Sequence, residues 1–276
     1  MGRKRRKHGS GGHAPPHSAG GPVKSLKRAR KIVSNYHALT AQIHAQRADS
    51  EAVALLEREL AANGGVRGYQ LASALSTDAH STSKWVAKTL RKLGWTHPAS
   101  SKKPKPRVLE VGAVNTQLLE CRSLDVRAID LHSLHPSRIE EVDFMAIRQP
   151  EVCYDVLVLS MVLNCVPDAP ARAAMLRKLR RVLRPGGLLF MVLPLSCLQH
   201  SHTIDEKLFV ECCAAVGLKA KPDEHRTTPK LWFSVLEAAA PDEAAADRYR
   251  QRRKQPAGSG KKRKHKSRGA GFDVLL

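Results

Sequence analysis

The chain has few aromatic residues: Phe, Trp and Tyr make up only 4% of its 276 residues. Its core must therefore consist mainly of aliphatic side chains, and a hydrophobic content of 42% is enough to form one. No apolar run approaches the roughly 20 residues that a membrane-spanning helix needs. No hydrophobic segment follows the basic N-terminus, so we expect neither a secretory signal nor a membrane partner.

Cysteine and histidine patterns typical of disulfide frameworks and metal sites are also absent. The six cysteines form no CxxC pair, which fits a reducing compartment and free, mostly buried thiols. His132 and His135 are spaced HxxH, and His200 and His202 lie close together. None of these histidines has a cysteine or acidic companion at ligand spacing, so we expect no metal site.

The sequence contains no GxGxxG motif and no Walker lysine motif. Residues 107–116 do place an apolar strand before a turn, but that turn contains a single glycine, Gly112. Without a glycine-rich loop the turn is poorly suited to hold a pyrophosphate, which argues against NAD and FAD. A nucleoside-bearing cofactor without phosphates fits better, although Gly112 alone could equally be an ordinary glycine at a strand end.

Positive charge is abundant and unevenly placed. Residues 1–48 contain 11 lysines and arginines and no acid, whereas residues 248–276 contain 11 and one acid. Of the net charge of +22, these two segments carry +21 and the centre of the chain carries +1. Polycations on both sides of a nearly neutral centre favour nucleic acid phosphates as the partner over simple solvation.

Composition divides the chain into five parts. Residues 1–31 and 241–276 are expected to be disordered basic tails, residues 32–97 a helical segment, residues 98–106 a linker, and residues 107–240 an α/β domain.

The tails carry further signals. The basic clusters at 3–7 and 261–266 resemble nuclear localisation signals, and having one in each tail favours the nucleus or nucleolus. The final residues, 271–276, are apolar. They could dock on the fold or bind a partner, and the sequence does not distinguish the two.

Hydrophobic periodicity predicts the elements. A helix is expected over 32–62, with a stop at 63–65, followed by two shorter helices near 67–75 and 85–93. From residue 107 strands and helices alternate, which predicts a doubly wound, mostly parallel seven-stranded Rossmann-like sheet. The expected strands are 108–111, 126–129, a short one near 142–144, 155–159, 188–193, 218–221 and 231–236, and the expected helices are 116–121, 170–183 and 205–216.

Polar residues follow the predicted strands where a doubly wound sheet binds its ligands. Asp130 ends the second strand, where a carboxylate can accept both hydroxyls of a ribose. Asp143 and Phe144 follow the third, where the acid can accept an adenine amino group and the ring can pack on the base. The alternatives are a solvent-exposed Asp130, a turn Asp143 and a core Phe144.

Together with the turn at 184–187, these features resemble the layout of class I S-adenosylmethionine-dependent methyltransferases. Longer segments resemble one family within them, the 25S rRNA adenine-N1 methyltransferases of fungal nucleoli, over roughly residues 62–236. The resemblance is carried by residues 64–65, 69–70, 72–73, 82–84, 109–119, 126–131, 135–136, 143–145 and 155–167. It implies S-adenosylmethionine as cofactor, with Gly112 and Asp130 as its first contacts.

The resemblance also implies a substrate, an adenine of large-subunit rRNA or of a pre-ribosome, which is methylated at N1. We expect the protein to act as a monomer. N1 of an unpaired adenine has a free lone pair, so it needs positioning rather than a strong base. Asn164 is the candidate to hold the base, unless it only satisfies the end of the fourth strand. Cys165 is expected to pack rather than react. The alternatives are a non-catalytic S-adenosylmethionine sensor and a ribosome-assembly factor.

Overall fold

The structure is a computed structural model. It describes residues 25–78, 82–97, 103–148, 153–254 and 271–276.

One mixed sheet forms the centre of the molecule, with the strand order β3-β2-β1-β4-β5-β8-β6 and β7 paired with β8. The strands are β1 Arg107–Val111, β2 Asp125–Asp130, β3 Glu140–Glu141, β4 Tyr154–Ser160, β5 Leu183–Pro194, β6 Leu218–Ala220, β7 Arg226–Thr227 and β8 Leu231–Ala238. The first five are parallel, and β8 runs antiparallel between β5 and β6. The predicted seven-strand, doubly wound sheet is confirmed, and β7 is an eighth strand that the sequence did not indicate.

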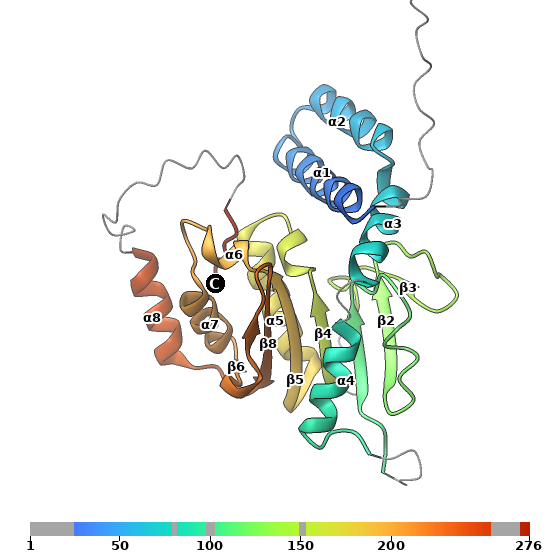
Figure 1. Cartoon of the computed structure of the whole chain (residues 1–276). Helices are drawn as coiled ribbons and strands as arrows, with labels where there is room; N and C mark the ends of the chain where they lie inside the picture. Colours follow the sequence, from blue (N-terminus) through green and yellow to red (C-terminus); the bar gives the residue numbers. More distant parts are fainter. Residues whose placement is uncertain (1–24, 79–81, 98–102, 149–152, 255–270) are drawn as a thin grey trace, which may run out of the picture.

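Both faces of the sheet are covered, as is usual for parallel strands that are apolar along their whole length. Alternate residues of β4 point to opposite sides: Leu157 and Leu159 join one core, and Val156 and Val158 join the other. The first core is completed by α5 (Ala169–Val182) and α7 (Glu206–Ala215), and the second by α4 (Thr82–Lys92). Figure 1 shows α4 and α5 on opposite sides of the strands.

The helical segment differs from its prediction. Two helices, α1 (Leu26–Ala45) and α2 (Ser50–Ala62), replace the single helix expected over 32–62. Asp49 starts the second one, because its carboxylate accepts the N–H groups of Glu51 and Ala52. Helix α1 also begins inside the expected disordered tail. With α3 (Gly65–Asp78), these helices gather at one end of the sheet in Figure 1.

Two more expectations are wrong. Residues 116–121 were expected to be a helix, but they form turns, with the Glu120 N–H donating to the Thr116 carbonyl over 3.2 Å. Within the expected basic tail at 241–276, α8 (Glu243–Lys254) is a regular helix. Residues 271–276 lie against the fold, which was one of the two alternatives that the sequence left open. No helix among the described residues has the length and apolar character to cross a membrane.

Candidate functional site

The parallel strands β1, β2 and β4 end at the same edge of the sheet, and there the structure gathers the residues that the sequence singled out. Gly112 directly follows β1, Asp130 closes β2, and Asn164 lies four residues beyond β4 in a short 3-10 helix (η1, Leu163–Cys165). In doubly wound sheets, ligands bind at this edge.

Gly112 has a left-handed backbone with φ of +78°, and its N–H donates to the Ile129 carbonyl over 2.9 Å. A Cβ at this position would lie 2.3 Å from Cγ2 of Val162. The position therefore excludes a side chain for two reasons, backbone conformation and space. The atom it would hit belongs to the loop after β4, so Gly112 lets that loop close over the end of β1.

Asp130 is half-buried and already bonded within the chain. Its Oδ1 accepts the backbone N–H of His132 over 3.0 Å and Nε2 of Gln70 over 3.3 Å. Burial raises the pKa of this carboxyl above 3.8, while both hydrogen bonds act in the opposite direction. Gln70 also donates to the carbonyl of His132 over 2.6 Å, so it joins α3 to the end of β2.

Buried acceptors remain open around this site. Oε1 of Gln70 and Oε2 of Glu110 are both buried, and neither has a hydrogen-bond partner among the described residues. Glu110 lies two residues before Gly112, near the carboxyl end of β1. Burial raises the pKa of Glu110 to about 8. An unpaired buried acceptor is costly, and a ligand that donates hydrogen bonds or carries positive charge relieves that cost.

The N-terminal helices supply a cover for this edge. The ring of Tyr36 in α1 stacks on Tyr69 in α3, with centroids 4.3 Å apart. Nε2 of His37 lies 3.4 Å from Sγ of Cys165, and the hydroxyl of Thr82 lies 3.1 Å from that of Ser160.

Sequence reasoning missed Gln70, Glu110 and this cover. The available signals were weak: Tyr69 and Gln70 belonged to the segments that resemble the family, and Glu110 was a conspicuous acid in an apolar strand. Nothing in the local pattern around Gln70 indicates that its side chain reaches Asp130.

The two residues expected to contact the adenine of the cofactor, Asp143 and Phe144, lie just beyond β3. Asp143 is exposed, and its Oδ1 accepts the Met145 N–H over 2.8 Å. Phe144 is only 3% exposed and packs in the core, with Nζ of Lys178 5.3 Å from the ring centre. Their roles at the base of a cofactor remain predictions.

Asn164 is half-buried beside Cys165. Its Nδ2 donates to Sγ of Cys165 over 3.3 Å, and its buried Oδ1 has no partner among the described residues. Burial raises the pKa of the Cys165 thiol to about 12, so the reactive thiolate is scarce near neutral pH. These facts support packing for Cys165 and leave a free acceptor on Asn164.

All six cysteines are free, but only Cys212 and Cys213 are buried, so the expectation of mostly buried thiols is wrong. Among the described residues, no group of three or more His, Cys, Asp or Glu side chains could hold a metal ion.

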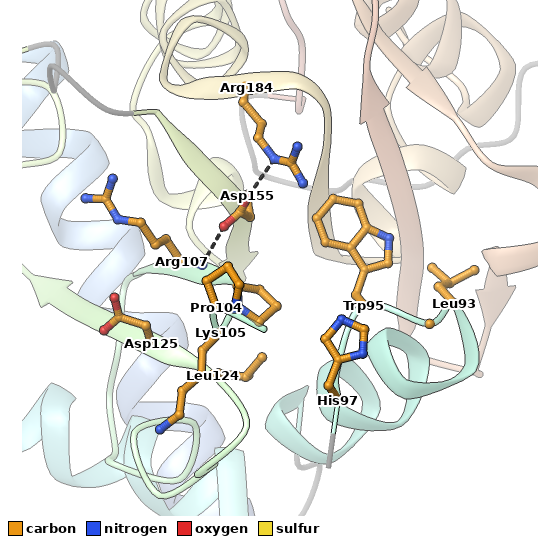
Figure 2. A pocket seen from close by; sticks show the side chains of 12 residues that line it. Leu93, Trp95, His97, Pro104, Lys105, Arg107, Leu124, Asp125, Asp155 and Arg184 are labelled. Carbon is orange, nitrogen blue, oxygen red and sulfur yellow. Dashed lines mark hydrogen bonds and ion pairs between the residues drawn. The ribbon is translucent and has the colours of Figure 1, made fainter. Parts of the chain in front are cut away.

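A hollow of about 910 Å³ lies at the opposite edge of the sheet, where β1, β2 and β4 begin (Figure 2). Asp155 at its centre accepts the Arg107 backbone N–H over 2.7 Å and pairs with Arg184, whose guanidinium lies over Trp95. Because doubly wound sheets bind ligands at the carboxyl ends of their strands, we assign the functional site to the other edge.

A model of one protein family matches most of the chain. Residues 54–267 match the family described as 25S rRNA (adenine(2142)-N(1))-methyltransferase, Bmt2. That range contains Gly112, Asp130 and Asn164.

Two curated proteins are similar to the chain. The 25S rRNA adenine-N(1) methyltransferase of Schizosaccharomyces pombe is 34% identical over 200 residues, which cover 67% of this chain and 72% of that protein. The 25S rRNA (adenine(2142)-N(1))-methyltransferase of Saccharomyces cerevisiae is 30% identical over 164 residues, covering 56% of this chain and less than half, 46%, of that protein.

Among solved structures, a Burkholderia thailandensis 1,6-didemethyltoxoflavin-N1-methyltransferase with bound S-adenosylhomocysteine has a TM-score of 0.46 and 14% identity. The match covers 60% of this chain and 83% of that one. At this low similarity, neither the substrate nor the cofactor of that enzyme can be assigned to this chain.

Proposed function

The chain belongs to the 25S rRNA (adenine(2142)-N(1))-methyltransferase family, and we propose that it transfers a methyl group from S-adenosylmethionine to N1 of an adenine in large-subunit rRNA. The observation that carries this proposal is the family match across the whole strand-end site. Gly112, Asp130 and Asn164 all fall within it.

The residues around Asp130 fit the proposed cofactor. The carboxylate of Asp130 would accept the ribose hydroxyls, and Gly112 leaves the end of β1 without a side chain. The open acceptors of Gln70 and Glu110 suit a ligand with amino groups and positive charge. Asp143 and Phe144 are proposed for its adenine end. S-adenosylmethionine, when bound, supplies an electrophilic methyl group on a sulfonium.

The chain's own contribution to the reaction is positioning. N1 of an unpaired adenine carries a lone pair, so no residue has to remove a proton before it attacks. Asn164 would hold the base through its free Oδ1, and the cover formed by α1 and α3 would exclude water. A thiol adduct is unnecessary for attack by a ring nitrogen, in agreement with the raised pKa of Cys165.

The charged ends of the chain would bring RNA to this site. Residues 1–48 and 248–276 carry nearly all of the net charge, and polycations bind nucleic acid phosphates with release of counterions. We propose that the protein acts as a monomer in the nucleolus on rRNA or a pre-ribosome. The two basic clusters support the location.

A reconstituted reaction tests the function. Purified protein is incubated with isotope-labelled S-adenosylmethionine and large-subunit rRNA that lacks the modification, and the digested RNA is analysed by mass spectrometry. We expect labelled 1-methyladenosine with the wild type and none with Asp130→Ala. Cofactor binding without any methylation of rRNA or pre-ribosomes would instead favour a sensor or an assembly factor.

A further inference from the structure

Arg172, in the first turn of α5, is a buried cation without a matching anion. Its side chain is 8% exposed, and it forms no ion pair with any carboxylate of the described residues. Nη1 donates to the carbonyl of Asp273 over 2.8 Å and Nη2 to that of Pro167 over 3.4 Å. Nε has no partner among those residues. Two carbonyl dipoles and the ring of Phe272, 4.9 Å away, face the charge.

The acids closest to Arg172 are engaged elsewhere. The carboxylate of Asp273 is bonded by both terminal nitrogens of Arg253, with Nη2 3.0 Å from Oδ2. Asp168 caps α5, with its Oδ1 2.7 Å from the N–H of Ala171. Burial lowers the pKa of Arg172, while the Cys197 thiol and the charges of both acids oppose this shift. An unpaired buried charge is strongly unfavourable, and an anionic ligand would remove this cost.

A cavity of about 220 Å³ adjoins this cation, which is room for several waters at about 30 Å³ each. The cavity lies at the same edge of the sheet as the proposed active site. Its lining residue Asn164 comes shortly after the end of β4, and residues 196–201 come shortly after the end of β5. The lining includes the guanidinium of Arg172, the amide of Asn164, the hydroxyl of Ser196 and the imidazole of His200.

The C-terminal segment, residues 271–276, builds one wall of this cavity. Phe272 is 7% exposed and Val274 is fully buried. The carbonyl of Phe272 accepts the Ser201 hydroxyl over 2.6 Å, and the Leu275 N–H donates to the carbonyl of Ala169 over 3.1 Å. The segment lies beyond the family match, which ends at residue 267.

We propose that this cavity binds a backbone phosphate of the RNA substrate and that Arg172 provides its counter-charge. A phosphodiester carries one permanent negative charge and accepts hydrogen bonds from a guanidinium and from a hydroxyl such as that of Ser196, which lines the cavity. Asn164 lines the same cavity, so the phosphate belongs to the target nucleotide or to its immediate neighbour. Arg172 is then a positioning residue. The inference rests on the proposed function, because it takes RNA as the substrate.

The test combines protein variants with modified RNA. Arg172→Met removes the charge, whereas Arg172→Lys keeps the charge but lacks the planar guanidinium group. Arg177→Met is the matched control, because this exposed arginine lies on the same helix. Each protein methylates RNAs in which one phosphate flanking the target adenosine is replaced by a neutral methylphosphonate. The readouts are kcat/KM for RNA, calorimetric affinity for S-adenosylmethionine and thermal unfolding.

For the wild type, we expect one methylphosphonate to lower kcat/KM by about 10- to 100-fold, as for a lost hydrogen bond to a charged group. Arg172→Met loses a similar factor on unmodified RNA and becomes insensitive to that linkage, while its cofactor affinity stays unchanged. Arg172→Lys falls between them, and Arg177→Met changes less than about twofold.

A wild type that tolerates neutral linkages at every flanking position overturns the inference, as does an Arg172→Met enzyme that remains as sensitive as the wild type. If Arg172→Met does not fold, Arg172→Gln takes its place because it also removes the charge, and a sensitivity to the linkage equal to that of the wild type contradicts the phosphate contact. Failure of the wild type to form any 1-methyladenosine would refute the proposed function, whereas methylation without linkage sensitivity refutes only the phosphate site.

Discussion

Segments from opposite ends of the chain cover two parts of the candidate site, which lies at the carboxyl ends of the parallel strands. We name Gly112, Asp130 and Gln70 the cofactor half, covered by the N-terminal helices. We name Asn164, Arg172 and Phe272 the acceptor half, walled by the C-terminal segment. The charge of Asp130 is hydrogen-bonded within the chain. Among the described residues, the charge of Arg172 meets two carbonyls and an aromatic ring but no carboxylate.

This difference indicates what each half requires from its ligand. The cofactor half has an oriented carboxylate and open acceptors, which suit a small ligand rich in donors. The acceptor half has a cation without its counter-ion, which suits a polyanion that arrives from outside. Substitutions should therefore separate cofactor affinity from RNA turnover.

The largest effect is expected from Gly112→Ala. The new Cβ would lie 2.3 Å from Val162 at a φ of +78°, so overpacking adds to backbone strain. We expect a loss of about 3 kcal/mol in the free energy of unfolding, measured with urea. Gly186→Ala is the control, because its φ is +73° and nothing lies within 4 Å of its Cβ. Equal losses in the two variants would show that Val162 is not the obstacle.

Asp130→Ala tests the cofactor half directly. Loss of the carboxylate should weaken S-adenosylmethionine binding by about 100-fold, or about 2.7 kcal/mol, while RNA affinity stays nearly constant. Calorimetry measures the first and filter binding the second. Asp125→Ala, at the exposed start of the same strand, should leave both unchanged. Unchanged cofactor affinity in Asp130→Ala would contradict the assignment of this half.

Glu110 should make stability depend on pH. Its pKa of about 8 in the folded protein lies above the ordinary value of 4.5, so the folded state binds the extra proton. Its contribution is fully present below pH 4.5 and is lost as the pH rises through 8. Glu110→Gln should remove this decline and raise the free energy of unfolding at pH 9 by at least about 1 kcal/mol. Parallel profiles of unfolding free energy against pH for the two proteins would show that Glu110 does not have a raised pKa in the folded state.

The smallest effect is expected from Cys165→Ser. A packing thiol is replaceable by a hydroxyl of similar size, so kcat should fall less than about threefold. A loss of several orders of magnitude in kcat would instead indicate covalent catalysis by Cys165, next to Asn164 in the acceptor half.

Local patterns were enough to predict the sheet. The apolar runs of β4 and β5 are long and uninterrupted, and Asp205 caps α7 at the start of the helix expected over 205–216. The expected helix over 116–121 failed because a short apolar stretch there forms turns that bury Leu118 instead.

Contacts between distant residues could not be predicted in this way. Gln70 reaches Asp130 across 60 residues, and Arg172 reaches Asp273 across 101. Neither pair leaves a periodicity or a spacing in the sequence. The strand-end residues of the site were therefore identifiable, while the elements that cover them and the unpaired cation beside Asn164 were not.

Methylation of rRNA in living cells is the most direct test of the proposed function. Large-subunit rRNA is isolated from cells that lack the protein and from the same cells supplied with the wild type or with Asp130→Ala, and 1-methyladenosine is quantified by mass spectrometry. We predict that one 1-methyladenosine disappears and that only the wild type restores it. An unchanged 1-methyladenosine content in the cells that lack the protein would contradict the proposed function.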